Sequence, residues 1–269
     1  MAAKPPIPKE HGSWAMLIVP LVVGLSVAPG WHWRSPVLWV AALAFFLLRY
    51  PLAMLVKTRR RAASSQRVEL WRWAAIYGGL AGLCGGWLVL ANGLWWLVPM
   101  SLLGALLVVL HLWLVARRQE MSVTGELSAI VGLAMGAPVA YYVAGGQLDA
   151  IALLLWLING LYFGGAVFYI KLKVRQQPRS PAPDKISERL LKARACLTYQ
   201  TFALTLVILL VAWQKAPLLS LLAFLPATVK IGYGALHWQD KKSLSLVRLG
   251  VTEIFHSVAF AVLIIVAFR

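Results

Sequence analysis

The chain has 269 residues, of which 61% are hydrophobic and 13% are charged, and its mean hydropathy is +0.75. A soluble domain holds roughly 25% charged residues, so this composition excludes one and predicts an integral membrane protein. The apolar segments run to about twenty residues instead of alternating over about ten, which predicts spanning helices and excludes a barrel.

Nine apolar segments predict an all-α bundle of nine transmembrane helices that forms a single polytopic domain over residues 1–269. They lie at about 13–29, 36–56, 71–91, 94–115, 125–144, 149–171, 197–213, 217–236 and 247–268. The first segment is also compatible with a signal peptide, because basic residues precede it and Ser26-Val27-Ala28 resembles a cleavage site. We favour a retained helix, since the count of nine requires it.

The formal charge of +17 is distributed unevenly along the chain. With nine spans and a cytoplasmic N-terminus, only Arg34, Lys215 and Arg269 of the 26 Lys and Arg residues fall outside, and the other 23 fall inside. This asymmetry follows the positive-inside rule and indicates a cell inner (plasma) membrane protein whose cytoplasmic face meets anionic lipid. It removes the need for nucleic-acid binding. The basic loop 172–196 is expected in the cytoplasm and the C-terminus outside.

A proline-rich segment before the first helix is stiff and extended, and it delivers Glu10 and His11 to the membrane surface. These two residues have two interpretations: a solvated segment, or a lid over an inner-side opening. Cys84 and Cys196 show neither a CxxC motif nor metal-ligand spacing, so neither a disulfide nor a metal site is expected.

The inner ends of three expected helices carry ionisable residues. Snorkelling explains Lys57 and the basic residues after it, but Arg49 lies about eight residues deeper in the membrane. His111 lies near the inner end of the fourth helix. Glu126 begins the fifth helix, where the helix dipole would favour a carboxylate; the alternative is a residue that lines a cavity.

The sixth expected helix carries a polar stripe at helical spacing, which consists of Asn159, Tyr162, Ala166, Tyr169 and Lys173. Lys171 lies close to its end. Lipid would not tolerate such a stripe, so we expect it to face the bundle interior. After a proline-rich loop, an amphipathic run at 187–191 predicts a short helix on the membrane surface.

The eighth and ninth helices place two opposite charges at similar depth. Lys230, Tyr233 and His237 share one face of the eighth, and Glu253 and His256 share a face of the ninth. Lys230 and Glu253 lie roughly 7–10 Å inside the apolar layer at about 1.5 Å of rise per residue. Because an unpaired charge there is costly, we expect the two to pair across antiparallel neighbours.

Ionisable and phenolic side chains of six helices all lie in the cytoplasmic half of the membrane. They are Arg49, His111, Glu126, Tyr169, Lys171, Lys173, Lys230, Glu253 and His256. A polar cavity that opens to the cytoplasm would explain all of them. The alternative is a set of unrelated snorkelling residues.

Several motifs resemble those of the YwiC-like membrane protein family. They are Pro8-Lys9-Glu10-His11-Gly12-Ser13-Trp14-Ala15-Met16, Asn159-Gly160-Leu161-Tyr162-Phe163, Phe168-Tyr169-Ile170-Lys171-Leu172-Lys173, Leu225-Pro226-Ala227 and Gly250-Val251-Thr252-Glu253. The resemblance covers essentially the whole chain and implies family membership but little mechanism.

More distantly, the chain is similar to the UbiA-type prenyltransferases, which implies a nine-helix bundle with a cytoplasm-facing cavity. Those enzymes hold Mg²⁺ and a diphosphate with Asp-x-x-x-Asp motifs at the inner ends of helices two and six. Here one such position holds Arg49, Lys57 and Arg59, and the other holds Tyr169, Lys171 and Lys173. No carboxylate pair remains to coordinate a metal, so no magnesium–diphosphate site is expected.

The sequence therefore predicts a protein that binds an anionic or lipid-like, isoprenoid-type ligand in a cytoplasm-facing polar cavity, with no cofactor identified. The predicted ligand-binding residues are Glu10, His11, Arg49, Lys57, Glu126, Asn159, Tyr162, Tyr169, Lys171 and Lys173, with Lys230, Glu253 and His256 as acid/base or pairing groups. A small-molecule or anion transporter and a non-catalytic assembly subunit are the alternatives. The outer half of the expected bundle lacks polar residues, which disfavours a transporter, because alternating access needs a path on both sides. The sequence also lacks an acidic pair and any nucleophile–base spacing, which disfavours an enzyme.

Overall fold

The computed structural model describes residues 5–8, 11–30, 33–58, 64–179, 181–238 and 245–269. Every regular element in these ranges is a helix, so the predicted all-helical class is confirmed. The chain divides into two compact units, residues Met1–Trp156 and Leu157–Arg269. Each unit is described by itself.

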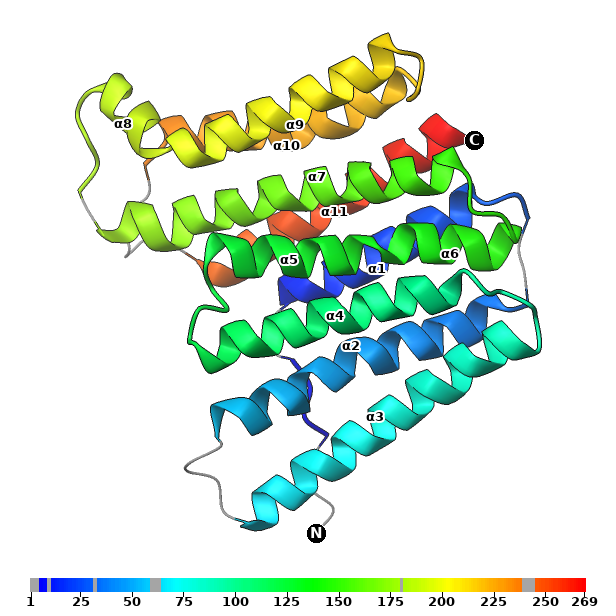
Figure 1. Ribbon diagram of the computed structural model, residues 1–269. Coiled ribbons are helices and arrows are strands. Elements are labelled where there is room, and N and C mark those ends of the chain that lie inside the picture. The colour runs from blue at the N-terminus through cyan, green and yellow to red at the C-terminus, as the bar shows by residue number, and fades with distance from the viewer. Residues whose placement is uncertain (1–4, 9–10, 31–32, 59–63, 180, 239–244) are drawn as a thin grey trace. The chain divides into compact units, whose positions relative to one another are not determined.

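The first unit holds six helices (Figure 1). They are α1 (His11–Val27), α2 (Ser35–Lys57), α3 (Ser64–Leu90), α4 (Leu97–Ala116), α5 (Val123–Ala134) and α6 (Gly136–Gly145). α2 packs along α3 and against α4 and α6, while α1 packs against α5 and α6. Gly24 allows the close approach of α1 to α6, because a Cβ at this position would collide with the carbonyl oxygen of Ala137.

The second unit begins within α7 (Ala150–Lys171). This helix continues as a π-helical turn, η1 (Leu172–Gln176), and a 3₁₀ turn, η2 (Gln177–Arg179), before α8 (Ile186–Lys192), α9 (Arg194–Ala212), α10 (Leu219–Leu236) and α11 (Leu246–Phe268). α10 packs against both α9 and α11, and α8 lies against α9 and α10. The short amphipathic helix expected in the basic loop is therefore present as α8.

Eight helical segments of the described chain are long and apolar enough to cross a membrane. The ninth expected span, α1, has 17 residues and is shorter, so the count of nine stays a prediction. The fifth expected helix is a single span that breaks at Met135 between α5 and α6. Pro138 explains the break, because its ring clashes with the carbonyl four residues earlier, at Ala134, and its nitrogen carries no proton.

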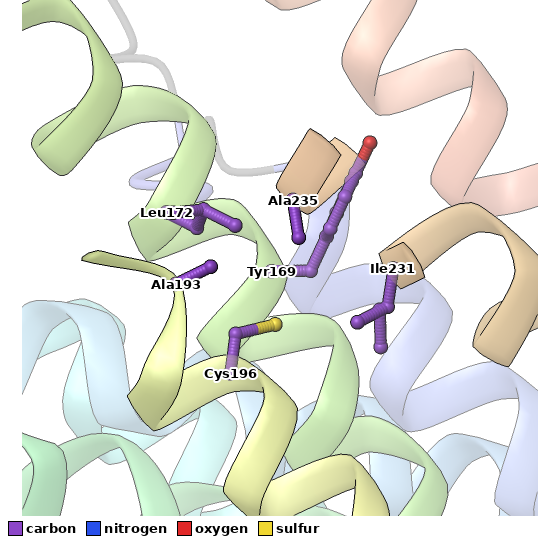
Figure 2. Packing of buried hydrophobic residues seen from close by; sticks show 6 residues of the cluster. All are labelled: Tyr169, Leu172, Ala193, Cys196, Ile231 and Ala235. Atoms are coloured by element: carbon purple, nitrogen blue, oxygen red, sulfur yellow. The ribbon is translucent and has the colours of Figure 1, made fainter. Parts of the chain in front are cut away.

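A cluster of buried residues packs together the end of the second unit at which α7 passes into η1 (Figure 2). It consists of Tyr169, Leu172, Ala193, Cys196, Ile231 and Ala235. These residues come from α7, η1, α9 and α10, and from Ala193 between α8 and α9. The cluster fixes the position of Tyr169, whose ring contacts Lys230.

Candidate functional sites in the two units

The polar stripe that runs along α7 into η1 is buried. Asn159 is 0% exposed, Tyr162 3%, Tyr169 7% and Lys173 5%. The Tyr162 ring stacks on the Phe260 ring of α11, with 3.8 Å between the ring centroids. The prediction that this face of the helix points into protein is confirmed.

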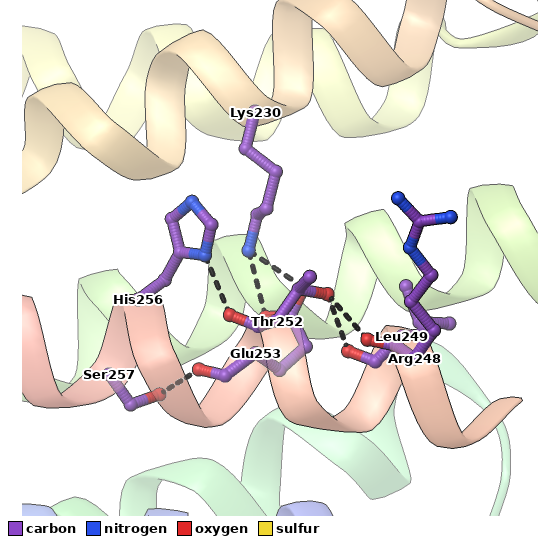
Figure 3. Close-up of polar contacts among 7 residues, drawn as sticks. All are labelled: Lys230, Arg248, Leu249, Thr252, Glu253, His256 and Ser257. Atoms are coloured by element: carbon purple, nitrogen blue, oxygen red, sulfur yellow. Dashed lines mark hydrogen bonds and ion pairs between the residues drawn. The ribbon is translucent and has the colours of Figure 1, made fainter.

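Lys230 and Glu253 form an ion pair between α10 and α11 (Figure 3). The Lys230 Nζ lies 2.7 Å from Oε1 and 2.8 Å from Oε2 of Glu253. The same ammonium lies 4.8 Å from the centre of the Tyr169 ring, which gives it a cation–π contact. The pairing expected from the sequence is confirmed.

The other polar residues of these two helices make local contacts. His256 Nδ1 lies 2.6 Å from the carbonyl oxygen of Thr252 on its own helix. The Tyr233 and His237 rings stack with centroids 3.8 Å apart, and His237 caps the end of α10.

Lys173 already has a partner at the end of α10. Its Nζ donates to the carbonyl oxygen of His237 at 2.9 Å, Gln177 Nε2 donates to Gly234 at 2.9 Å and Arg189 Nη1 to Leu236 at 3.0 Å. The last carbonyls of a helix have no partners within it and carry partial negative charge. Lys173, predicted as a ligand-binding residue, is thus engaged in capping α10.

The first unit contains a cavity of about 220 Å³. Its wall is built from all six helices and is almost wholly apolar. The exceptions are the basic residues Arg49 and His111 and the hydroxyl residues Ser101 and Ser128. Arg49 and His111 lie toward the C-terminal ends of α2 and α4, and Ser128 lies in the first half of α5, so these three polar groups gather at one end.

Charged side chains surround the polar end of this cavity. The charges of Arg49, Lys57 and Glu120 all act on the His111 ring. Lys57 Nζ lies 3.0 Å from Oε1 of Glu120. Burial raises the pKa of Glu120, but the hydrogen bond and charge of Lys57 outweigh it and hold the pKa below its ordinary value.

Sequence reasoning missed Glu120, which follows the basic pair Arg117-Arg118 in the loop between α4 and α5. The signal in the sequence was a carboxylate directly after a basic pair. Glu126, which was predicted, lies half-buried in the first turn of α5 and is not among the cavity-lining residues.

The remaining predicted residues divide between the units. Lys171 is half-buried at the end of α7. Glu10 lies outside the described residues, and His11 begins α1 with its side chain undescribed. Of the nine ionisable and phenolic residues that were expected to line one cytoplasm-facing cavity, Arg49, His111 and Glu126 belong to the first unit, and the other six belong to the second. That a single cavity is lined by the predicted residues of both units stays a prediction.

The apolar helices of both units define a multi-pass helical membrane protein. The family model for YwiC-like protein matches residues 7–141, and the chain belongs to this family, as its motifs indicated. The matched region contains every residue that lines the cavity.

Two relatives extend the comparison. The chain is 25% identical over 174 residues to the uncharacterized protein YwiC of Bacillus subtilis (strain 168), covering 64% of this chain and 68% of that protein. It is 24% identical over 265 residues to an uncharacterized protein of Haemophilus influenzae, covering 97% and 98% respectively. No solved structure matches the chain. Similarity to the UbiA-type fold therefore stays a prediction.

Proposed function

We propose that the protein binds an anionic, lipid-like molecule in the cavity of its first unit. The hydrocarbon chain lies among the apolar side chains of α2, α4 and α5, and the headgroup lies at Arg49 and His111. The observation that supports this most directly is the separation of the wall into a long apolar part and one basic end. An amphiphilic molecule is divided in the matching way, into a long apolar chain and one polar headgroup.

The size of the cavity supports a single flexible chain. The cavity has a volume of about 220 Å³. Pockets for drug-sized molecules are larger, about 300–1,000 Å³. A cavity of this size accommodates one acyl or prenyl chain segment.

The position of Arg49 in the membrane also supports an anionic ligand. A charged side chain within the hydrocarbon layer is costly, and proteins retain such residues where they line a functional path. A bound headgroup of opposite charge would reduce that cost.

We place the protein in the inner (plasma) membrane, with the basic end of the cavity toward the cytoplasm and its anionic lipid. The uneven distribution of Lys and Arg residues supports this orientation. The ligand site relies on side-chain cations and not on a magnesium–diphosphate centre.

Two glycines of α3 allow a matched test. Gly85 lines the cavity, and a Cβ added there meets nothing within 4 Å, so Gly85→Leu would extend a side chain into the open space. Gly82 also has nothing within 4 Å of an added Cβ but is not a lining residue, so Gly82→Leu is the control. Both changes replace glycine in the same helix, so their effects on helix propensity cancel.

The measurement uses the full chain in lipid nanodiscs with a photoreactive fatty acid whose diazirine lies in the chain. Cross-linked peptides are identified by mass spectrometry. We expect labelling of α2, α4 and α5 in the wild type and in Gly82→Leu. Gly85→Leu should label about tenfold less, because displacing two methylenes forfeits about 1.6 kcal/mol of burial. Equal labelling of both variants, or labels only outside these helices, would overturn the proposal.

A further inference from the structure

We infer that α8 anchors the second unit to the anionic surface of the bilayer and, through Arg189, fastens the end of α10 to that surface. The partner of the exposed face of α8 is thus the headgroup layer of anionic phospholipid. This inference concerns the second unit alone and does not depend on the cavity of the first.

α8 lies at the level where a spanning helix leaves the membrane. After Ala193 the chain continues as α9, which begins at Arg194 and is long and apolar enough to cross a membrane. α8 packs against α9 and α10 at the end of the unit where α9 begins (Figure 1). Trp238 follows α10 at the same end, and tryptophan is enriched at membrane–water interfaces. A helix in this position lies beside the headgroup layer.

The apolar side chains of α8 are largely uncovered by the rest of the chain. Ile186 is 62% exposed, Leu191 63% and Leu190 38%. Ile186 and Leu190 are four residues apart and therefore share one face of the helix, and Leu191 adjoins it. In water these side chains stay exposed, whereas a helix that lies in the plane of the membrane buries its apolar face just below the headgroups.

Charge complementarity identifies the surface as anionic. The exposed charged residues between positions 179 and 194 are mostly basic: Arg179, Lys185, Lys192 and Arg194, against Asp184 and Glu188. Lys185 is the N-cap residue of α8 and Arg194 follows its end, so cations flank the apolar face on both sides. The basic loop is expected in the cytoplasm, and the cytoplasmic leaflet carries the anionic lipid.

Arg189 connects α8 to the end of α10. Its Nε donates to the carbonyl oxygen of Pro183 at 2.7 Å, and its Nη1 donates to that of Leu236, the last residue of α10, at 3.0 Å. A second contact joins the same segments, because the Lys192 ammonium lies 5.3 Å from the centre of the Trp238 ring. The last carbonyls of a helix have no partners within it, and helix ends fray. An α8 that is held by the membrane therefore also holds the last turn of α10.

The test measures hydrogen–deuterium exchange of the full chain in nanodiscs of phosphatidylcholine alone and of an equal mixture with phosphatidylglycerol. We expect the anionic lipid to slow exchange in α8 and in the last turn of α10. Lys185→Gln and Arg194→Gln should each reduce the ratio between the two lipid compositions about fivefold, the effect of one cation at an anionic surface. Lys215→Gln, an exposed change in the turn between α9 and α10, should keep the wild-type ratio.

Arg189→Lys separates the anchor from its link to α10. Lysine keeps the charge but lacks the guanidinium fork that donates to two carbonyls at once. α8 should keep its response to anionic lipid, whereas the end of α10 should lose its response. Each variant is compared with itself in two lipid compositions, so a general loss of stability does not imitate this result.

Three results would contradict the inference. Equal exchange of α8 in both lipid compositions would reject the anionic bilayer surface as its partner. Wild-type ratios in both Lys185→Gln and Arg194→Gln would reject binding through these cations. An end of α10 that still responds to anionic lipid in Arg189→Lys would reject the link through Arg189.

Discussion

Lys230 and Glu253 are joined by two contacts of 2.7 and 2.8 Å, and their side chains are only 10% and 9% exposed. The pair links α10 to α11, and the Tyr169 ring of α7 covers the ammonium. A buried ion pair adds little net stability compared with apolar residues of the same size, but breaking it leaves one charge uncompensated. The pair therefore specifies how the two helices align.

The first prediction is a double-mutant cycle on this pair. Lys230→Met and Glu253→Gln should each lower the free energy of unfolding by up to about 3–5 kcal/mol, because each leaves a buried polar group alone. The double variant should recover part of the loss. Thermal unfolding in detergent measures this, and Arg248→Met, which changes an exposed residue earlier in α11, is the control. Strictly additive losses would show that the two residues do not interact.

Much of the second unit could be predicted from the sequence, since helical periodicity and the cost of burying charge leave few arrangements. The polar residues of the stripe recur at helical spacing and therefore lie on one face of the helix. Because polar side chains are unfavourable in contact with lipid, that face was expected to point into the protein. Lys230 and Glu253 lie on consecutive antiparallel helices at equal depth, so their contact needed no further information.

The cavity of the first unit could not be predicted in this way. Its wall combines helices that are distant in the sequence, and periodicity does not say which of these are neighbours. The contact between Lys57 and Glu120 joins the end of α2 to the loop after α4 for the same reason. The role of Lys173 depends on where α10 ends, which a sequence pattern does not give to the nearest residue. By contrast, the helix break at Met135 could have been predicted from the sequence, because Pro138 disrupts the helical hydrogen bonding just before it.

The second prediction concerns pH and the contact between Lys57 and Glu120. The pKa of Glu120 is lowered from its ordinary value of 4.5, so the unfolded chain binds the proton more readily. The ion pair therefore stabilises the folded chain at pH values above 4.5. This stabilisation is lost as the pH falls through the pKa that Glu120 has in the folded state. Lys57 is 48% exposed, so the contribution should stay below about 1 kcal/mol.

The measurement compares thermal unfolding of the wild type and Lys57→Gln from pH 7 down to pH 3. The wild type should be slightly more stable at pH 7, and the difference should vanish at the acid end. Added salt should also reduce it. Lys215→Gln, which changes an exposed residue outside this contact, supplies the reference. A difference that grows toward low pH would contradict the assignment of Glu120.

The third prediction compares two glycines of α10 that are two residues apart. A Cβ at Gly234 would lie 2.5 Å from Cε2 of Tyr169 and 3.0 Å from Cε of Lys173, whereas one at Gly232 meets nothing within 4 Å. Gly234→Ala should therefore destabilise by about 1–3 kcal/mol, because Tyr169 is held in the buried cluster and cannot move aside cheaply. Gly232→Ala should be neutral or stabilise by up to about 1 kcal/mol through helix propensity.

Chemical or thermal unfolding of both variants, measured in the same detergent, provides the comparison. Because Tyr169 also contacts Lys230, Gly234→Ala should lose less stability when Lys230 and Glu253 have already been replaced by Met and Gln, since Tyr169 is then free of its cation. Equal effects of the two alanines would show that α10 does not pack against α7 at Gly234. An unchanged cost in the background without the ion pair would show that Tyr169 is positioned by the apolar cluster alone.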